Sequence, residues 1–273
     1  MTEGRDTGAL PQGVGLLAGE VVVITGAGAG IGRATAYACA AEGACVVVGD
    51  IEAEAAGATV ETILAEGGRA TAVEGDVADP QTHRNLAQAS QGTFGGLSGW
   101  VNNAADAGSG TLTETDDATW QRIQSVTLGG VFLGCRQALE AMGKGGGGAI
   151  VNISSGAGLA AEPGLAAYGA AKAGVIALTQ SAAVESAALG IRVNCVAPGP
   201  ILTAGLSGWM DAFPGGREAF EAQIPQQRLG RPEEIAQVVV FLLSSRASYV
   251  NGAMLPADGG IRARLASPRP YPG

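Results

Sequence analysis

The sequence predicts one α/β domain, in which helices cover both faces of a doubly wound parallel sheet. From residue 21 onward, short runs rich in Val and Ile alternate with Ala-rich stretches that are long enough to form helices. The runs are apolar almost throughout, as expected of strands that are buried on both faces. Hydrophobic residues make up 47% of the 273 residues and charged residues 15%, which is typical of a globular protein.

The expected strands and helices follow one another with little chain between them. Strands are predicted at residues 21–25, 45–50, 70–77, 99–104, 148–155, 191–199 and 253–260. Helices are predicted at about residues 31–42, 53–66 and 80–90, from 115 onward, and at 168–189 and 232–244. Residues 204–224 break this alternation, because Gly and Pro interrupt them. The domain is expected to span residues 19–262, between a flexible N-terminal tail (1–18) and a C-terminal tail (263–273).

Composition argues against several classes of partner. The formal net charge is −9 and the sequence contains no cluster of Lys and Arg, so neither nucleic acid nor an anionic membrane is expected as a partner. No apolar run approaches the ~18 residues of a membrane span, and the N-terminus does not resemble a signal peptide. We therefore expect a cytoplasmic protein.

The cysteines and the single histidine point away from metal chemistry. Cys39, Cys45, Cys135 and Cys195 lie in apolar segments without CxxC spacing, which indicates free thiols in a reducing compartment. His83 lies between polar neighbours and is expected at the surface. Neither a zinc site nor a Ser–His–Asp triad is expected.

A glycine-rich turn joins the first expected strand to the first expected helix. In the segment TGAGAGIG, Gly26, Gly30 and Gly32 follow a TGxxxGxG pattern. Glycine lets the backbone turn sharply and approach a ligand, and the N-terminus of the helix that follows favours a pyrophosphate. Asp50 closes the second strand, where a carboxylate accepts the hydroxyls of an adenosine ribose and repels a 2′-phosphate. The pattern therefore indicates NAD rather than NADP.

Tyr168 and Lys172 stand four residues apart in a stretch of Ala and Gly, so they share one face of the expected helix. On its own such a pair is common on helix surfaces. Here it belongs to an ordered set of motifs: TGAGAGIG, GDV, NNAA, IVNISS, YGAAK, RVNCVAPGPILT and RPEEIA…FLLSS…GAMLPADGG. In this set and order, from Val21 to Gly260, the chain resembles the short-chain dehydrogenase/reductase family, whose fold is of the Rossmann type.

The resemblance implies an oxidoreductase that interconverts a secondary alcohol and a ketone by hydride transfer with NAD. It implies Tyr168 as the general acid/base, and Lys172 as the group that binds the nicotinamide ribose and that, together with the positive nicotinamide ring, lowers the pKa of the phenol. Ser155, thirteen residues before Tyr168, would hydrogen-bond the substrate oxygen, with Ser154 as its supporting neighbour.

The family also implies a set of cofactor contacts, which lie in the glycine-rich turn, at the ends of the next strands and in the PGPILT segment. Asp76 would contact the adenine, Asn102 the ribose region and Thr203 the carboxamide. The implied contacts are Gly26, Gly30, Ile31, Gly32, Asp50, Ile51, Asp76, Val77, Asn103, Ala104, Tyr168, Lys172, Pro198, Gly199, Ile201 and Thr203.

One position departs from the family pattern. Thr127 stands where the family usually has an asparagine that positions a water in a proton relay through the lysine. Threonine is shorter and β-branched, and it is expected to hydrogen-bond the backbone of its own helix. Thr127 is kept as the fourth catalytic position, and the change predicts lower catalytic efficiency unless its backbone carbonyl holds the water.

Residues 204–224 match the variable substrate loop of the family, and residues 105–110 and 156–165 should line the same cleft. The expected substrate contacts are Ser155, Ala157, Leu159, Tyr168, Trp209, Met210 and Phe213. Their apolar character favours a largely apolar alcohol or ketone. The alternative is that the large side chains of the loop pack it against its own domain.

Family members usually form a homotetramer or a homodimer, and small residues in 115–142 and 168–189 would let helices of two subunits pack closely. Two other functions stay open. A 3-oxoacyl or polyketide-type carbonyl reductase is favoured by the RPEEIA…LPADGG segment but opposed by Asp50, because such relatives generally use NADP. An NAD-binding sensor or structural protein with little turnover is favoured only by Thr127.

Overall fold

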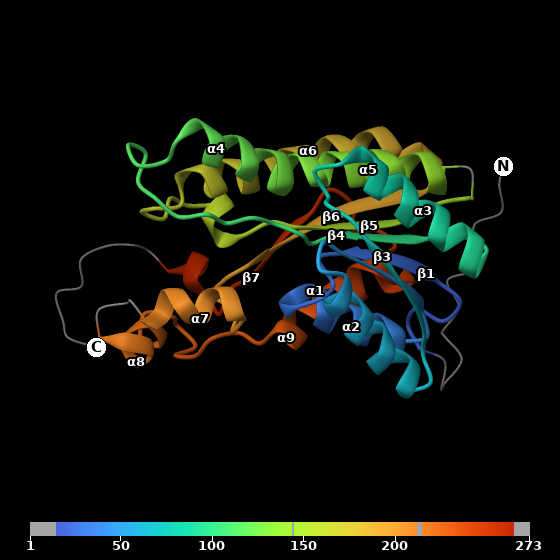
Figure 1. Cartoon of the computed structure of the whole chain (residues 1–273), viewed down its shortest axis with the longest axis horizontal. Helices are drawn as coiled ribbons and strands as arrows, with labels where there is room; N and C mark the ends of the chain where they lie inside the picture. Colours follow the sequence, from blue (N-terminus) through green and yellow to red (C-terminus); the bar gives the residue numbers. More distant parts are fainter. Residues whose placement is uncertain (1–14, 144, 212–214, 265–273) are drawn as a thin grey trace.

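Within the described residues, a seven-stranded sheet forms the centre of the molecule and helices cover both of its faces (Figure 1). The structure is a computed structural model, and it describes residues 15–143, 145–211 and 215–264. The strands lie in the order β3-β2-β1-β4-β5-β6-β7, and all neighbours are parallel. The predicted doubly wound α/β fold is therefore confirmed.

The elements agree with the expected ones to within a few residues. The strands are β1 (Val21–Thr25), β2 (Cys45–Asp50), β3 (Arg69–Glu74), β4 (Gly99–Asn102), β5 (Gly148–Ile153), β6 (Ile191–Pro198) and β7 (Met254–Ala257). The helices are α1 (Gly30–Ala41), α2 (Ala53–Ala65), α3 (Pro80–Phe94), α4 (Asp117–Ile123), α5 (Gly130–Met142), α6 (Ala166–Ser186), α7 (Ala204–Asp211), α8 (Gly216–Glu221) and α9 (Pro232–Leu243). The segment that breaks the alternation thus carries two short helices, α7 and α8.

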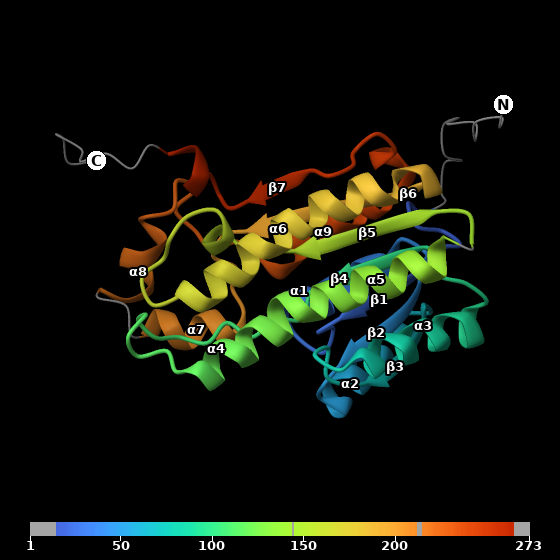
Figure 2. The ribbon, with the colours of Figure 1, turned by 90° about the horizontal axis from the view of Figure 1, so that it is seen from above.

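The sheet separates two apolar cores. Helices α1, α2 and α9 lie on one face, and α3, α5 and α6 lie on the other (Figure 1). Because alternate residues of a strand point to opposite faces, Val22 and Ile24 of β1 join the core beneath α1 and α9. Val23 joins the core beneath α5 and α6. Figure 2 shows α5 and α6 running side by side over the sheet. Burial on both faces explains why the strands are apolar throughout.

The N-terminal boundary of the domain lies earlier than expected. Leu17, expected in the flexible tail, is 1% exposed and packs in the core beneath α1 and α9. Its N–H donates to the Glu42 carbonyl at 3.0 Å, and the Leu16 N–H donates to the Glu42 carboxylate at 2.7 Å. The free energy gained by burying the leucine side chain exceeds the conformational cost of ordering the glycine-containing segment around it. Residues 1–14 and 265–273, the rest of the two expected tails, lie outside the described residues.

His83 is buried, not exposed as its polar neighbours in the sequence indicated. Its exposure is 1%, and its ring stacks on that of Trp100 with a centroid distance of 6.0 Å. The reason is helical periodicity, because Thr82, His83, Leu86 and Ser90 share the inner face of α3. The four cysteines are buried and free, as predicted.

Gln227 carries backbone strain that a single substitution should relieve. Among the described residues it is the one non-glycine residue with a positive φ, at 55°. The left-handed conformation costs a non-glycine residue about 1–2 kcal/mol of stability, and glycine removes this cost. Glycine itself lowers the stability by about 0.5–1 kcal/mol, because it loses more conformational freedom when the chain folds. We expect Gln227→Gly to raise the melting temperature in thermal denaturation, and Gln226→Gly, at the exposed neighbour without positive φ, to lower it. A lower melting temperature for Gln227→Gly would contradict the assignment of strain.

Candidate active site

The glycine-rich turn lies at the carboxyl end of β1 and opens α1. Gly26 and Gly30 adopt φ values of +63° and +52°, which favour glycine. A Cβ on Gly32 would collide with the Gly26 carbonyl, so the turn and the first turn of the helix pack without room for side chains. The N-cap residue, Ala29, makes no side-chain hydrogen bond to the helix. The N-cap side chain thus leaves the first amides of α1 uncapped in the described part of the chain, and these amides fit an anionic group such as a pyrophosphate.

Asp50 lies beside this turn at the end of β2. Its carboxylate accepts the N–H of Gly28 at 2.7 Å and the N–H of Glu52 at 3.1 Å. A Cβ on Gly28 would lie 2.8 Å from the carboxylate oxygen, so only glycine allows this approach. Among the described residues, no ion pair involves Asp50. The guanidinium of Arg33, the nearest cation in sequence, donates to the Gly28 carbonyl. Within the described part of the chain, no cation therefore pairs with the carboxylate beside the turn.

The NNAA segment is tied to the turn by Asn103, while Asn102 points elsewhere. The Asn103 amide donates to the carbonyls of Thr25 and Gly26, both at 3.0 Å. Asn102, expected near the ribose, is 2% exposed, and its side chain lies between the sheet and the helices. It accepts from the Trp100 indole at 2.7 Å, because residues two apart in a strand share a face. The expectation for Asn102 is therefore wrong.

Lys172 lies in the interior beneath Tyr168. It is 1% exposed, and its Nζ donates to the Ile153 carbonyl at 2.6 Å. The ammonium lies 5.5 Å from the centre of the Tyr168 ring. The hydroxyl of Ser154 donates to the Lys172 carbonyl at 2.8 Å and so fixes α6 to the end of β5. Ser155, the next residue, lies close enough to the Tyr168 phenol to lower its pKa. The end of β5 and the first turns of α6 thus bring Ser155, Tyr168 and Lys172 together.

Burial shifts the pKa values of this cluster. It raises the pKa of the Tyr168 phenol, and the hydrogen bond with Ser155 opposes the shift. It lowers the pKa of Lys172 from 10.5 to about 8, while the electrostatic interaction with Cys195 opposes the shift. The resemblance implied a lowered pKa for Tyr168. In the chain itself burial outweighs the effect of Ser155 on the pKa of Tyr168, so the phenol carries a proton that it can donate to a substrate oxygen.

Thr127 joins two segments of chain in an unexpected way. It is fully buried in a π-helical segment, η1 (Gln124–Gly129), between α4 and α5. Its hydroxyl donates to the Asp106 carbonyl at 2.9 Å and accepts the Asp106 N–H at 3.0 Å. The expected bond to its own helix is therefore replaced by two bonds to the segment that follows the NNAA motif. One hydroxyl satisfies both backbone groups of Asp106.

Comparison with known proteins assigns the family. The family model described as enoyl-(acyl carrier protein) reductase matches residues 26–262. The chain belongs to the short-chain dehydrogenase/reductase family. It is an oxidoreductase that acts on CH–OH donors.

Several relatives of this short-chain dehydrogenase/reductase match along almost its whole length. Cyclohexanol dehydrogenase of Acinetobacter sp. (strain SE19) is 42% identical over 90% of this chain and 96% of that protein. Cis-4-hydroxycyclohexanecarboxylate dehydrogenase of Sinomonas cyclohexanicum is 44% identical over 89% of this chain and 97% of that protein. The crystal structure of a levodione reductase superposes with a TM-score of 0.87 at 36% identity, over 91% of this chain and 100% of that one.

The two segments that were expected to line the substrate cleft lie together near Tyr168. The segments 105–110 and 156–165 meet where the Gly110 N–H donates to the Gly164 carbonyl at 3.0 Å, and both border a small hollow beside Tyr168. Ala157 and Leu159 are half-buried in the second segment.

Met210, expected as a substrate contact, is 4% exposed and packs against Ile224 and Leu229. For this residue the structure favours the alternative that the loop packs on itself. Phe213 and the side chain of Trp209 lie outside the described residues.

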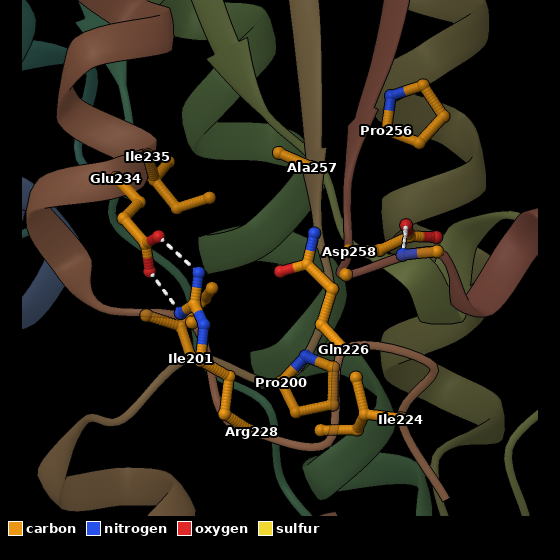
Figure 3. A pocket seen from close by; sticks show the side chains of 13 residues that line it. Pro200, Ile201, Ile224, Gln226, Arg228, Glu234, Ile235, Pro256, Ala257 and Asp258 are labelled. Atoms are coloured by element: carbon orange, nitrogen blue, oxygen red, sulfur yellow. Dashed lines mark hydrogen bonds and ion pairs between the residues drawn. The ribbon is translucent and has the colours of Figure 1, made fainter.

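A larger cavity of about 350 Å³ lies beyond the ends of β6 and β7 (Figure 3). Its wall includes Ile201, an expected cofactor contact, and the ion pair of Arg228 and Glu234, whose atoms approach to 2.7 Å. Hydrogen bonds from Arg228 and the Arg231 backbone lower the pKa of Glu234 to about 2. Neither Tyr168 nor Lys172 lines this cavity, so it is separate from the catalytic cluster.

The PGPILT segment approaches the glycine-rich turn. The methyl group of Thr203 lies 3.3 Å from the point where a Cβ on Gly30 would stand. The described residues contain no group of three or more His, Cys, Asp or Glu side chains suited to a metal ion. Among the same residues, no helix combines the length and the hydrophobicity that a membrane span requires.

Proposed function

We propose that the chain oxidises a secondary alcohol to a ketone, or catalyses the reverse reaction, with NAD as its cofactor. The observation that carries this proposal is the cluster at the end of β5 and the start of α6. There Tyr168 lies above the buried ammonium of Lys172, and the neighbouring Ser155 hydroxyl lowers the pKa of its phenol. A proton donor, a hydroxyl for the substrate oxygen and a fixed cation are what carbonyl reduction requires.

Each of these residues has a separate role in the proposed reaction. Ser155 hydrogen-bonds the substrate oxygen and holds it beside the phenol. Tyr168 gives its proton to that oxygen in reduction and takes a proton from the alcohol in oxidation. Lys172, held by the Ile153 carbonyl at 2.6 Å, stabilises the phenolate that reduction leaves behind. When bound, the cofactor supplies the hydride donor or acceptor and, in its oxidised form, a positive charge beside the phenol.

The chain's own residues fit the cofactor. The first amides of α1, which have no side-chain cap, would bind the pyrophosphate. Asp50 would bind the adenosine ribose, and Thr203, which approaches Gly30, would lie near the nicotinamide end. Ile31, Ile51, Ala104, Pro198 and Gly199 stay part of the proposed binding surface.

Asp50 supplies a test of the preference for NAD. Replacement by alanine should raise the Kd for NAD about 10-fold, because two charge-assisted hydrogen bonds to the ribose are lost. It should raise the affinity for NADP, because the repulsion of the 2′-phosphate is removed. Calorimetric titration of both dinucleotides measures the ratio, and Glu52→Ala, at an exposed neighbour, is the control. An unchanged ratio in Asp50→Ala would contradict the assignment of NAD.

The names of the relatives support a cyclic, largely apolar secondary alcohol as substrate. Cyclohexanol dehydrogenase is named for a cyclic secondary alcohol that it oxidises, and levodione reductase is named for a ketone that it reduces. A panel of cyclic alcohols assayed for NADH formation tests the proposal. The alternative of a carbonyl reductase in a biosynthetic pathway is opposed by Asp50, and the description of the family model names an enoyl reductase, which reduces a C=C bond and not a carbonyl. Tight NAD binding without turnover on any alcohol or ketone would favour the sensor alternative.

A homotetramer or homodimer and a cytoplasmic location complete the proposal. Large apolar side chains stand exposed on and after α5 and α6, at Phe132 (48%), Val184 (81%) and Leu189 (50%), and this supports contact between subunits there. Four free cysteines support a reducing compartment. Light scattering of the purified chain measures the oligomeric state.

A further inference from the structure

We propose that His83 is a positioning residue for cofactor binding, because it holds the turn that carries Asp76 and Val77 in the conformation that receives the adenosine end of the dinucleotide. The inference rests on the proposed function, since it takes this turn as part of the NAD site. It assigns a role to the single histidine of the chain, which lies outside the catalytic cluster.

The turn lies beside Asp50 at the carboxyl edge of the sheet. The Gly75 N–H donates to the Asp50 carbonyl at 2.9 Å. The Asp76 carboxylate accepts the Ala78 N–H at 2.8 Å, so that the side chain closes the turn on itself. These bonds shape the turn and join it to β2. They do not attach it to the helix layer beneath.

The attachment to the interior runs through Val77. Its carbonyl accepts from Nε2 of His83 at 2.9 Å. Its side chain lies about 3.0 Å from the point where a Cβ on Gly130 would stand, so the contact with α5 is close. Val77 is half-buried, and a carbonyl that has neither a donor nor water costs about 1–3 kcal/mol. Loss of the imidazole would therefore favour rotation of this carbonyl toward solvent. The whole turn would then change shape.

The imidazole is itself held in place. It stacks on Trp100, whose indole donates to Asn102 at 2.7 Å. Asn102 donates to Asn152 at 2.8 Å, and Asn152 donates to Thr179 of α6 at 2.9 Å. We call Trp100, Asn102, Asn152 and Thr179 the polar ladder. Because each member has a fixed partner, the ladder gives the His83 ring a rigid surface to lie against.

The contacts also define the protonation state of His83. A carbonyl only accepts, so Nε2 carries the proton of the neutral ring. Nδ1 is buried and, among the described residues, has no hydrogen-bond partner. Burial lowers the pKa of His83, Arg136 of α5 lowers it further, and the Val77 carbonyl and Asp79 oppose the shift. A second proton would place an unpaired N–H beside Arg136, so acid pH should loosen the turn.

Two variants separate the hydrogen bond from the ring. His83→Phe keeps an aromatic ring against Trp100 but has no donor, whereas His83→Gln keeps an N–H donor and does not titrate. We expect His83→Phe to raise the Kd for NAD and for ADP-ribose about 10-fold in calorimetric titration. The Kd for nicotinamide mononucleotide and kcat should stay within about twofold of wild type, and His83→Gln should bind ADP-ribose like wild type.

The pH dependence gives a second readout. Wild type should lose affinity for ADP-ribose as the pH falls below about 6.5, the ordinary pKa of histidine, because burial lowers the pKa of His83. His83→Gln should show no such loss. Both proteins contain Asp76 and Asp79, so a difference between them reports on His83.

Three results would overturn the inference: wild-type affinity for ADP-ribose in His83→Phe, no rescue in His83→Gln, or an equal loss of nicotinamide mononucleotide binding and kcat. Failure of the proposed function has a different signature, because the wild-type chain itself would then bind neither NAD nor ADP-ribose.

Discussion

Replacing Tyr168 by phenylalanine should lower kcat by about 10²–10⁴-fold, the contribution expected of a general acid. The variant keeps the ring above the Lys172 ammonium, a contact of 5.5 Å, and loses only the phenol oxygen. Because the phenol is the group that exchanges a proton with the substrate, the chemical step and not cofactor binding should suffer. Steady-state kinetics on a cyclic secondary alcohol, together with the Kd for NAD, measure the two effects separately.

A matched control exists on the surface. Tyr249 is fully exposed, and Tyr249→Phe removes the same atom far from the end of β5. It should leave kcat, the Kd for NAD and the melting temperature unchanged. Wild-type turnover in Tyr168→Phe would exclude the phenol as the proton donor. A matching loss of NAD affinity would mean that the variant disturbs the site as a whole.

Replacing Thr127 by valine should have the largest effect on stability. Valine has nearly the same shape, but it leaves both the N–H and the carbonyl of Asp106 without the partner that lies 2.9–3.0 Å away in the native chain. Each unpaired backbone group costs about 1–3 kcal/mol, so we expect the free energy of unfolding to fall by roughly 2–4 kcal/mol. Asp106 directly precedes residues 107–110, which border the small hollow beside Tyr168. A displaced Asp106 backbone should therefore lower kcat as well. Denaturant unfolding and steady-state kinetics measure the two losses.

Thr127→Ser is the matched variant, since it keeps the hydroxyl and should retain both bonds at a small packing cost. Equal stability of Thr127→Val and Thr127→Ser would show that the two bonds contribute nothing net. Thr127→Asn tests the family pattern directly. Position 127 is fully buried, so a longer side chain must displace the Asp106 backbone. A higher kcat in Thr127→Asn would favour the relay that the family pattern implies, and a lower one would favour the hydroxyl as the native solution.

The sequence was sufficient for the fold. Apolar runs of the length of VVVIT, separated by Ala-rich stretches, have few solutions other than a buried parallel sheet between helices. The ends of parallel strands meet at one edge of a sheet, so the positions of Asp50 and Ser155 already placed them at that edge. Helical spacing put Tyr168 and Lys172 on one face, but the choice of Ser155, Tyr168 and Lys172 as site residues came from the resemblance to the family.

The remaining details depend on contacts between distant segments. His83 has polar neighbours in sequence, but it faces Trp100 of β4. Thr127 bonds Asp106 because η1 brings it to a loop twenty-one residues away. Neither partner is visible in a local pattern. The position of Met210 also depends on a distant segment. An apolar residue in this loop fits either a substrate pocket or a small core, and the contact with Ile224 places Met210 in a small core.

The polar ladder has a consequence for how the sheet forms. Several strands are runs of small apolar residues, and a strand displaced by two positions would bury side chains of much the same kind. In the native alignment Asn102 of β4 stands opposite Asn152 of β5, and their amides bond. Displacement would leave both side-chain amides without a hydrogen-bond partner in the interior, which would lower the stability by about 1–3 kcal/mol for each amide. In a sheet whose hydrophobic strands are nearly interchangeable, this pair distinguishes the correct alignment from its neighbours.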